Sequence, residues 1–183
     1  MERKMTTLHS PVAIAALAAL LLIFGFREES ANFASPSVDF GIVVSDIDAA
    51  ARFYGESLGL SEAEGFEVGV DFCRAAGLTD EQPLSVRVFV LDDNGSGSKV
   101  KLMQLEGVES RPANNAFIHS QLGMSYMTLF VSDLDVVLRK LAKDGVKPLA
   151  AGPVKIGAEA TAPSLAVVRD PDGNLIELIG PRS

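Results

Sequence analysis

A strand, cap and helix phrase occurs twice in the chain, and this repetition constrains the fold more than any other feature. The first copy reads VDFGIVVSDIDAAARFYGESLGL (38–60) and the second reads SYMTLFVSDLDVVLRKLAKDGV (125–146). In each copy, an apolar run is followed by Ser-Asp and then by apolar residues at helical spacing. Asp46 and Asp133 are equivalent, so the offset between the copies is 133 − 46 = 87 residues. The pattern predicts two similar supersecondary modules.

Each module continues with strands after its helix. In the first, strands are predicted at 84–91 and 99–105, with an extra helix around 68–78 and a short strand near 60–64. In the second, VKPLAAGPVKIG, SLAVVRD and LIELIG predict strands, with a tight PDGN turn before the last one. The predicted boundaries are 35–183 for the folded domain, 38–107 for module one, 108–124 for a connector and 125–181 for module two.

The amino-terminal segment has the layout of an export signal. Arg3 and Lys4 precede PVAIAALAALLLIFGF (11–26), an apolar run without charge. The run is shorter than the roughly 20 residues that span a bilayer, and the residues after it match a cleavage site poorly. We therefore expect residues 1–34 to be a signal peptide or an uncleaved apolar anchor helix with its linker. Either form predicts an extracytoplasmic domain, which is periplasmic, secreted, or attached to the outer side of the cytoplasmic membrane.

Charge and cysteine content exclude several classes of function. The net charge of −8 and the absence of a Lys/Arg cluster argue against nucleic acid as a partner. Cys73 is the only cysteine, which excludes an intrachain disulfide and any multi-cysteine metal site, and its context predicts a small buried residue. His119 is the only histidine of the predicted domain and has no nucleophile motif near it, so no Ser/His/Asp triad is predicted.

The phrases VSDIDAAARFYGESLGL and VVRDPDGNLIELIGP resemble the vicinal oxygen chelate superfamily, which includes glyoxalase I, methylmalonyl-CoA epimerase, extradiol dioxygenases and the fosfomycin and bleomycin resistance proteins. The resemblance covers 38–181. It implies an α+β fold in which two βαβββ modules form a curled mixed sheet around a cleft. It also implies that the cleft closes within one chain or across a homodimer. In metal-dependent members, four side chains from the first and last strands of the modules bind a divalent ion.

The matching positions in this chain are Asp39, Gln104, Tyr126 and Glu177. Asp39 and Tyr126 stand where the family often has histidine, and Glu177 matches the usual glutamate. Alternation predicts that Gln104 shares the face of Leu102, which we take as the cleft lining. Carboxylate and amide oxygens suit Mg²⁺ or Mn²⁺ better than zinc, whereas the phenol of Tyr126 is a poor ligand.

Three functions remain open from the sequence. The first is a lyase or isomerase that uses a divalent ion on a small oxygenated substrate, with Glu177 or Asp39 as the catalytic base. The second is a metal-free module of the bleomycin-resistance type that binds a small molecule, with stacking surface from Tyr126, Phe130 and Phe89. The third is an interaction domain with a degenerate site, held at a membrane if the amino-terminal segment stays uncleaved.

Overall fold

The computed structural model describes residues 33–92 and 94–183. Residues 1–32, which contain the predicted signal or anchor, lie outside the described residues. In the described part of the chain, no helix has the length and apolar character needed to cross a membrane. Residues 37–183 form the unit that contains both predicted modules.

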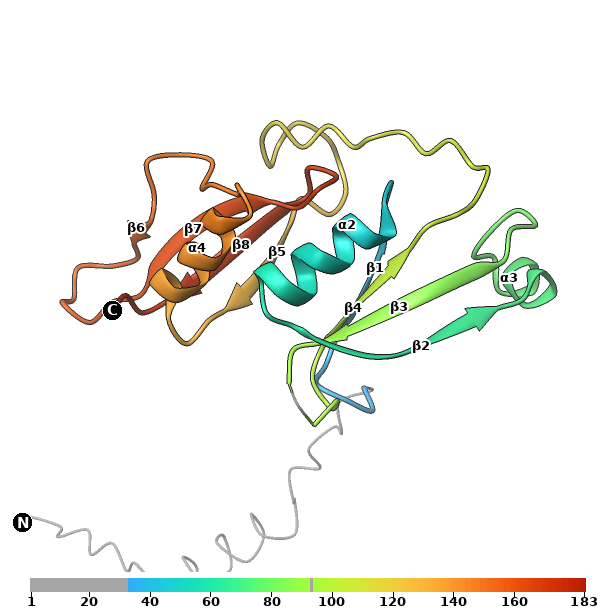
Figure 1. Cartoon of the computed structure of the whole chain (residues 1–183), viewed down its shortest axis with the longest axis horizontal. Coiled ribbons are helices and arrows are strands. Elements are labelled where there is room, and N and C mark those ends of the chain that lie inside the picture. The colour runs from blue at the N-terminus through green and yellow to red at the C-terminus, as the bar shows by residue number, and fades with distance from the viewer. Residues whose placement is uncertain (1–32, 93) are drawn as a thin grey trace, which may run out of the picture. The chain divides into compact units, whose positions relative to one another are not determined.

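The strands of this unit form two four-stranded mixed sheets with the same internal order (Figure 1). The first sheet has the order β1-β4-β3-β2 and contains β1 (Asp39–Val43), β2 (Ser61–Val68), β3 (Leu84–Val90) and β4 (Lys99–Met103). The second has the order β5-β8-β7-β6 and contains β5 (Tyr126–Phe130), β6 (Val154–Lys155), β7 (Ser164–Arg169) and β8 (Leu175–Gly180). In both sheets only the first pair is parallel. The α+β class and the modular repeat are therefore confirmed.

The helices begin where the repeated Ser-Asp predicts. Helix α2 (Ile47–Ala51) continues into a π-helical turn, η1 (Arg52–Ser57), and α4 (Leu134–Lys143) is its counterpart in module two. The carboxylate of Asp46 accepts hydrogen bonds from the backbone N–H groups of the first turn of α2, and Asp133 does the same for α4. Both aspartates thus satisfy donors that the helix itself leaves free. The extra helix is α3 (Val70–Ala76).

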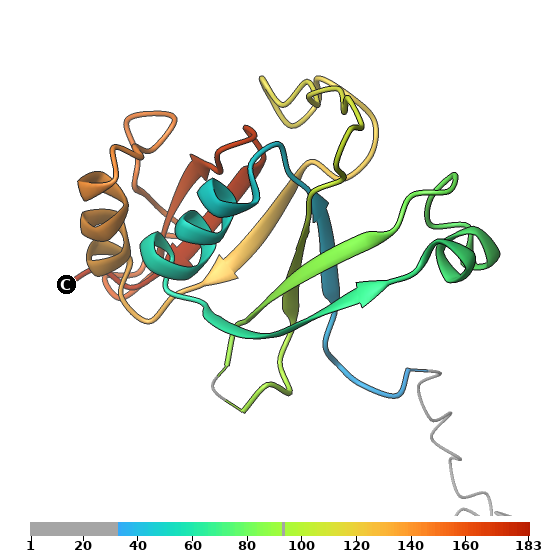
Figure 2. The same ribbon diagram turned by 45° about the vertical axis from the view of Figure 1, so that its right-hand side comes forward.

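Helices α2 and α4 lie beside each other and share one core with both sheets (Figure 2). This core takes alternate residues of the central strands, including Val100 and Leu102 of β4 and Ile176 and Leu178 of β8. A smaller cluster on the other face of the first sheet surrounds Cys73, which is fully buried, as predicted.

Two expectations about the sheets need correction. The strands do not form one curled sheet, because among the described residues β1 and β5 are edge strands that hydrogen-bond only within their own sheets. In addition, β2 has eight residues, although only a short strand near 60–64 was predicted. Its exposed, glutamate-rich sequence has low strand propensity, so pairing with β3 decides its conformation. Gly65 lies at an irregularity in this pairing, where a Cβ would come 2.4 Å from the carbonyl oxygen of Val86.

Two side-chain hydrogen bonds join the two modules. The hydroxyl of Tyr54 donates to Oδ2 of Asp170 at 3.0 Å, and both side chains are buried. Burial and the negative charge of Asp170 raise the pKa of Tyr54 far above its ordinary value. Ser57 donates to Asp144, and 144 − 57 = 87 is the repeat offset. Equivalent positions of the modules therefore meet, as they do across an approximate two-fold axis.

Candidate functional site

Each sheet has one face covered by α2 and α4 and an opposite face that these helices leave free. In β1, for example, Phe40 and Ile42 pack against the core, whereas Asp39 and Gly41 point the other way. We call the two free faces the cleft face. Its residues on the parallel strand pairs β1–β4 and β5–β8 are Asp39, Gly41, Val43, Lys99, Lys101 and Met103 in the first sheet and Tyr126, Thr128, Phe130, Leu175, Glu177 and Ile179 in the second.

An ion pair occupies the cleft face of the first sheet. Nζ of Lys101 lies 2.8 Å from Oδ2 of Asp39, on adjacent strands. This hydrogen bond and the positive charge of the ammonium lower the pKa of Asp39. The ammonium also lies 5.9 Å from the centre of the Phe66 ring, in cation–π range. Asp39 is thus already neutralised by a protein cation.

In the second sheet, Glu177 is held by its neighbour on β5. The hydroxyl of Thr128 donates to Oε2 of Glu177 at 2.6 Å. Tyr126 lies two residues earlier on the same face of β5, and 49% of it is exposed. The structure thus brings Glu177 and Tyr126 to one face, as predicted, and adds Thr128. Phe89, by contrast, is buried in the core beneath the helices and offers no stacking surface in the cleft.

Gln104 does not lie on the cleft face. Its Oε1 accepts a hydrogen bond from the backbone N–H of Ile47 at 3.0 Å, and its Nε2 donates to the carbonyl of Ser45 at 3.0 Å. Leu102, which shares its side of the strand, is a core residue. Gln104 therefore fixes the start of α2, and its amide is committed to the backbone.

Strand register identifies the true counterpart of Glu177 in module one. Gly41 pairs with Lys101, and Thr128 pairs with Glu177. Because 128 − 41 = 87 is the repeat offset, Lys101 and Glu177 are equivalent. Gln104, the residue predicted from the sequence, lies 104 − 101 = 3 positions after this counterpart. The apolar residues that flank Lys101 and Glu177 alike, in VKL and IEL, were the signal that would have found it.

These side chains do not fit the divalent ion that the resemblance implies. The position that should supply a fourth oxygen holds the ammonium of Lys101, which repels a cation and already binds Asp39. The amide of Gln104 points to the other side of the strand. Within residues 33–92 and 94–183, no three His, Cys, Asp or Glu side chains are grouped to hold a metal ion.

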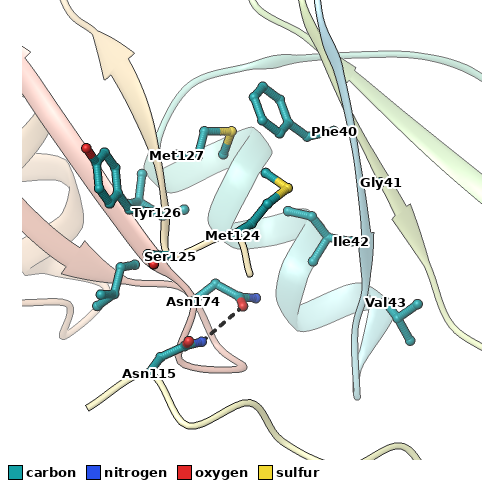
Figure 3. A pocket seen from close by; sticks show the side chains of 12 residues that line it. Phe40, Gly41, Ile42, Val43, Asn115, Met124, Ser125, Tyr126, Met127 and Asn174 are labelled. Carbon is teal, nitrogen blue, oxygen red and sulfur yellow. Dashed lines mark hydrogen bonds between the residues drawn. The ribbon is translucent and has the colours of Figure 1, made fainter. Parts of the chain in front are cut away.

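A pocket of about 260 Å³ lies at the seam between the modules, and we call it the seam pocket (Figure 3). Phe40 and Ile42 of β1 face Met124 and Met127 across it. Its other lining residues are Gly41, Val43, Asn115, Ser125, Tyr126, Asn174, Leu175 and Ile176. Nδ2 of Asn115 donates to Oδ1 of Asn174 at 3.3 Å, so these two amides lie together at one end of the pocket.

A second pocket, of about 460 Å³, lies where the connector passes over β7, and we call it the connector pocket. The connector supplies Ala116, Phe117, Ile118 and His119. The remaining lining residues are Pro148, Leu149, Ala150, Gly152, Val154, Leu165, Ala166, Val167, Arg169 and Leu175. His119 is exposed and stacks on Phe117. The sequence indicated neither the lysine of the cleft nor the arginine of this pocket.

Known proteins share this architecture. The family model described as Glyoxalase/Bleomycin resistance protein/Dioxygenase superfamily matches residues 37–178. A crystal structure of a glyoxalase family protein from Bacillus cereus is 22% identical, covers 85% of this chain and 99% of its own, and has a TM-score of 0.66. A glyoxylase/bleomycin resistance protein/dioxygenase domain from Frankia sp. is 18% identical over 82% of this chain and 93% of its own, with a TM-score of 0.55. No curated protein sequence matches.

Proposed function

The chain belongs to the glyoxalase/bleomycin resistance protein/dioxygenase superfamily, and from this premise we propose that it binds a small organic molecule without a metal ion. Membership in this superfamily is consistent with a small-molecule ligand and with a homodimer, but it does not select a reaction. The choice between the metal-dependent enzyme and the metal-free binder depends on the side chains of the cleft face.

The observation that carries the proposal is the lysine at the position equivalent to Glu177. Lys101 supplies a positive charge on the cleft face, at the position where a metal-binding relative would supply an anionic ligand. Its ion pair with Asp39 also occupies a second candidate ligand. A metal ion at this place would have to displace the ammonium of Lys101 from Asp39 and would be repelled by its positive charge. This argues for ligand binding by protein side chains without a metal ion.

The seam pocket supports a neutral ligand of about one ring. A 150 Å³ apolar cavity is known to hold benzene, so about 260 Å³ leaves space for a substituted ring. Apolar side chains of Ile42, Met124 and Met127 would cover the ring. The amides of Asn115 and Asn174 both donate and accept hydrogen bonds, which suits a hydroxyl or amide substituent.

Metal dependence is tested by elemental analysis and thermal unfolding of the protein purified in metal-replete buffer. We expect no stoichiometric divalent metal and no stabilisation by millimolar Mn²⁺ or Mg²⁺. Lys101→Glu should acquire Mn²⁺-dependent stabilisation, because it removes the ammonium and adds a carboxylate beside Asp39. Lys140→Glu on α4 makes the same charge change away from the cleft face and should not. Stoichiometric metal in the unmodified protein would restore the lyase or isomerase hypothesis, with Asp39 and Glu177 as its candidate ligands and bases.

Ligand binding is tested with benzamide and phenol derivatives in the presence of a chelator. Thermal stabilisation by such rings should disappear in Met124→Trp, which fills the seam pocket from an exposed position of the connector. Leu122→Trp, on the same connector but fully exposed and outside the pocket, is the matched control. Equal stabilisation of both variants, or none of the unmodified protein, would contradict the proposal and favour the interaction role.

We also propose that the domain functions outside the cytoplasm, because residues 1–34 combine a basic start with an apolar run. Cell fractionation tests this: the full chain should be found in the periplasm, medium or membrane, and a chain that starts at Ser35 should stay in the cytoplasm. Retention of the full chain in the cytoplasm would refute it.

A further inference from the structure

We propose that the connector pocket, which adjoins the seam pocket at Leu175, is a second ligand site that takes a planar aromatic molecule carrying one negative charge. The pocket lies between the connector and β7, and it has an apolar floor from Leu165 and Val167. Its volume of about 460 Å³ lies within the range of ordinary small-molecule sites and accommodates two fused rings.

The connector wall of this pocket is held in one conformation by hydrogen bonds. The backbone N–H of Phe117 donates to Oγ of Ser120 at 2.9 Å, and the N–H of Ser120 donates back to the carbonyl of Phe117 at 3.0 Å. Oγ of Ser125 donates to the carbonyl of Ile118 at 2.8 Å. The connector is therefore preorganised, which reduces the entropy that ligand binding must overcome.

This ordered wall keeps apolar surface exposed. Phe117 is 68% exposed and Ile118 is 58% exposed, although their backbones are fixed at the rim of an apolar pocket. The rings of Phe117 and His119 are nearly parallel, at 13°, with centroids 5.6 Å apart. Such a pair offers a flat face on which an aromatic ring stacks favourably. The exposed area is what a planar ligand would cover.

Arg169 gives the pocket an uncompensated positive charge. Its Nη1 donates to the carbonyl of Gly173 at 2.8 Å and its Nη2 donates to the carbonyl of Ala116 at 3.3 Å. Within residues 33–92 and 94–183 it has no carboxylate within ion-pair distance. Glu177, on the neighbouring strand, is held by Thr128. A guanidinium with N–H groups to spare beside apolar walls complements a carboxylate or sulfonate on the ligand.

The test uses 2-naphthoate and its uncharged isostere 2-naphthamide, with affinity measured by calorimetry on the full chain. We expect naphthoate to bind the unmodified protein about tenfold more tightly than naphthamide, because only the acid pairs with Arg169. In Arg169→Gln this preference should vanish while the affinity for naphthamide stays the same. The comparison of the two probes on the unmodified protein needs no variant. It therefore shows whether the site prefers an anionic ligand even if Arg169→Gln fails to fold.

Variants of the connector locate the site. Phe117→Ala should weaken naphthoate binding about five- to tenfold through the lost ring contact. Leu122→Ala, a fully exposed connector residue outside both pockets, should leave it unchanged, and so should the seam-filling Met124→Trp. Equal affinity of Phe117→Ala and Leu122→Ala, loss of binding in Met124→Trp, or equal affinity for acid and amide would each overturn the proposal. Met124 lines only the seam pocket, so the proposal for one pocket can be refuted while the proposal for the other stands.

Discussion

Removal of the buried hydroxyl of Tyr54 should show how much the hydrogen bond between the modules contributes to the free energy of unfolding. Tyr54→Phe keeps the ring among its core neighbours and deletes only the 3.0 Å hydrogen bond to Asp170. Hydrogen bonds to charged groups contribute about 1.5–3 kcal/mol. Oδ2 of Asp170 keeps a second donor, Nδ2 of Asn174 at 2.8 Å, so the carboxylate is not left without a partner. We therefore expect a loss of about 2 kcal/mol in the free energy of unfolding.

Urea denaturation measures this loss directly, with an unchanged slope and a lower midpoint. A loss of about 2 kcal/mol corresponds to a fall of roughly 4–8 °C in Tm for a domain of this size. The chain has one other tyrosine, and Tyr126→Phe is the matched control, because Tyr126 is half exposed and makes no hydrogen bond through its hydroxyl within the described residues. If the two variants are equally stable, the hydroxyl of Tyr54 does not hold the modules together and our account of the interface is wrong.

Three further outcomes follow from other contacts. The pKa of Tyr54 is raised on folding, so the protonated hydroxyl contributes fully to stability below about pH 10, the pKa of tyrosine in the unfolded chain. Above that pH the free energy of unfolding should fall by about 1.4 kcal/mol per pH unit. Alkaline denaturation should therefore be steeper for the unmodified protein than for Tyr54→Phe. Gln104→Ala should lower the free energy of unfolding by about 1 kcal/mol, because the start of α2 loses its brace, and calorimetry should find ligand affinity unchanged. Gly180→Ala should destabilise by about 1–3 kcal/mol in urea, since its Cβ would lie 2.4 Å from the carbonyl oxygen of Val131, whereas Gly69→Ala meets no atom within 4 Å and should have little effect.

The sequence predicted the scaffold better than the site, and strand register explains the difference. Asp46 and Asp133 were readable because a capped helix after an apolar strand is a local pattern. The equivalence of Lys101 and Glu177 depends on how β4 pairs with β1 and how β8 pairs with β5, which is not local. An error of three positions moved the candidate ligand from the cleft face to the core side of the strand, because side chains alternate along it.

The extent of the sheets was misjudged for a related reason. The eight residues of β2 lack strand propensity, and only the partner strand β3 makes them a strand. The separation into two sheets could likewise not be predicted from the sequence, because the apolar pattern of an edge strand does not reveal whether another strand pairs with its free side. Both pockets are bordered by the connector, whose residues carry no periodic signal at all.

The phrases that carry the family resemblance contain residues that hold the fold together. The aromatic pair of the first phrase supplies Tyr54, the DPDGN turn of the second supplies Asp170, and the buried hydrogen bond between them joins the modules. Lys101 lies outside both phrases, on the cleft face, where it pairs with Asp39. The resemblance thus identifies the scaffold, and the charge at position 101 is what argues that this scaffold binds its ligand without a metal.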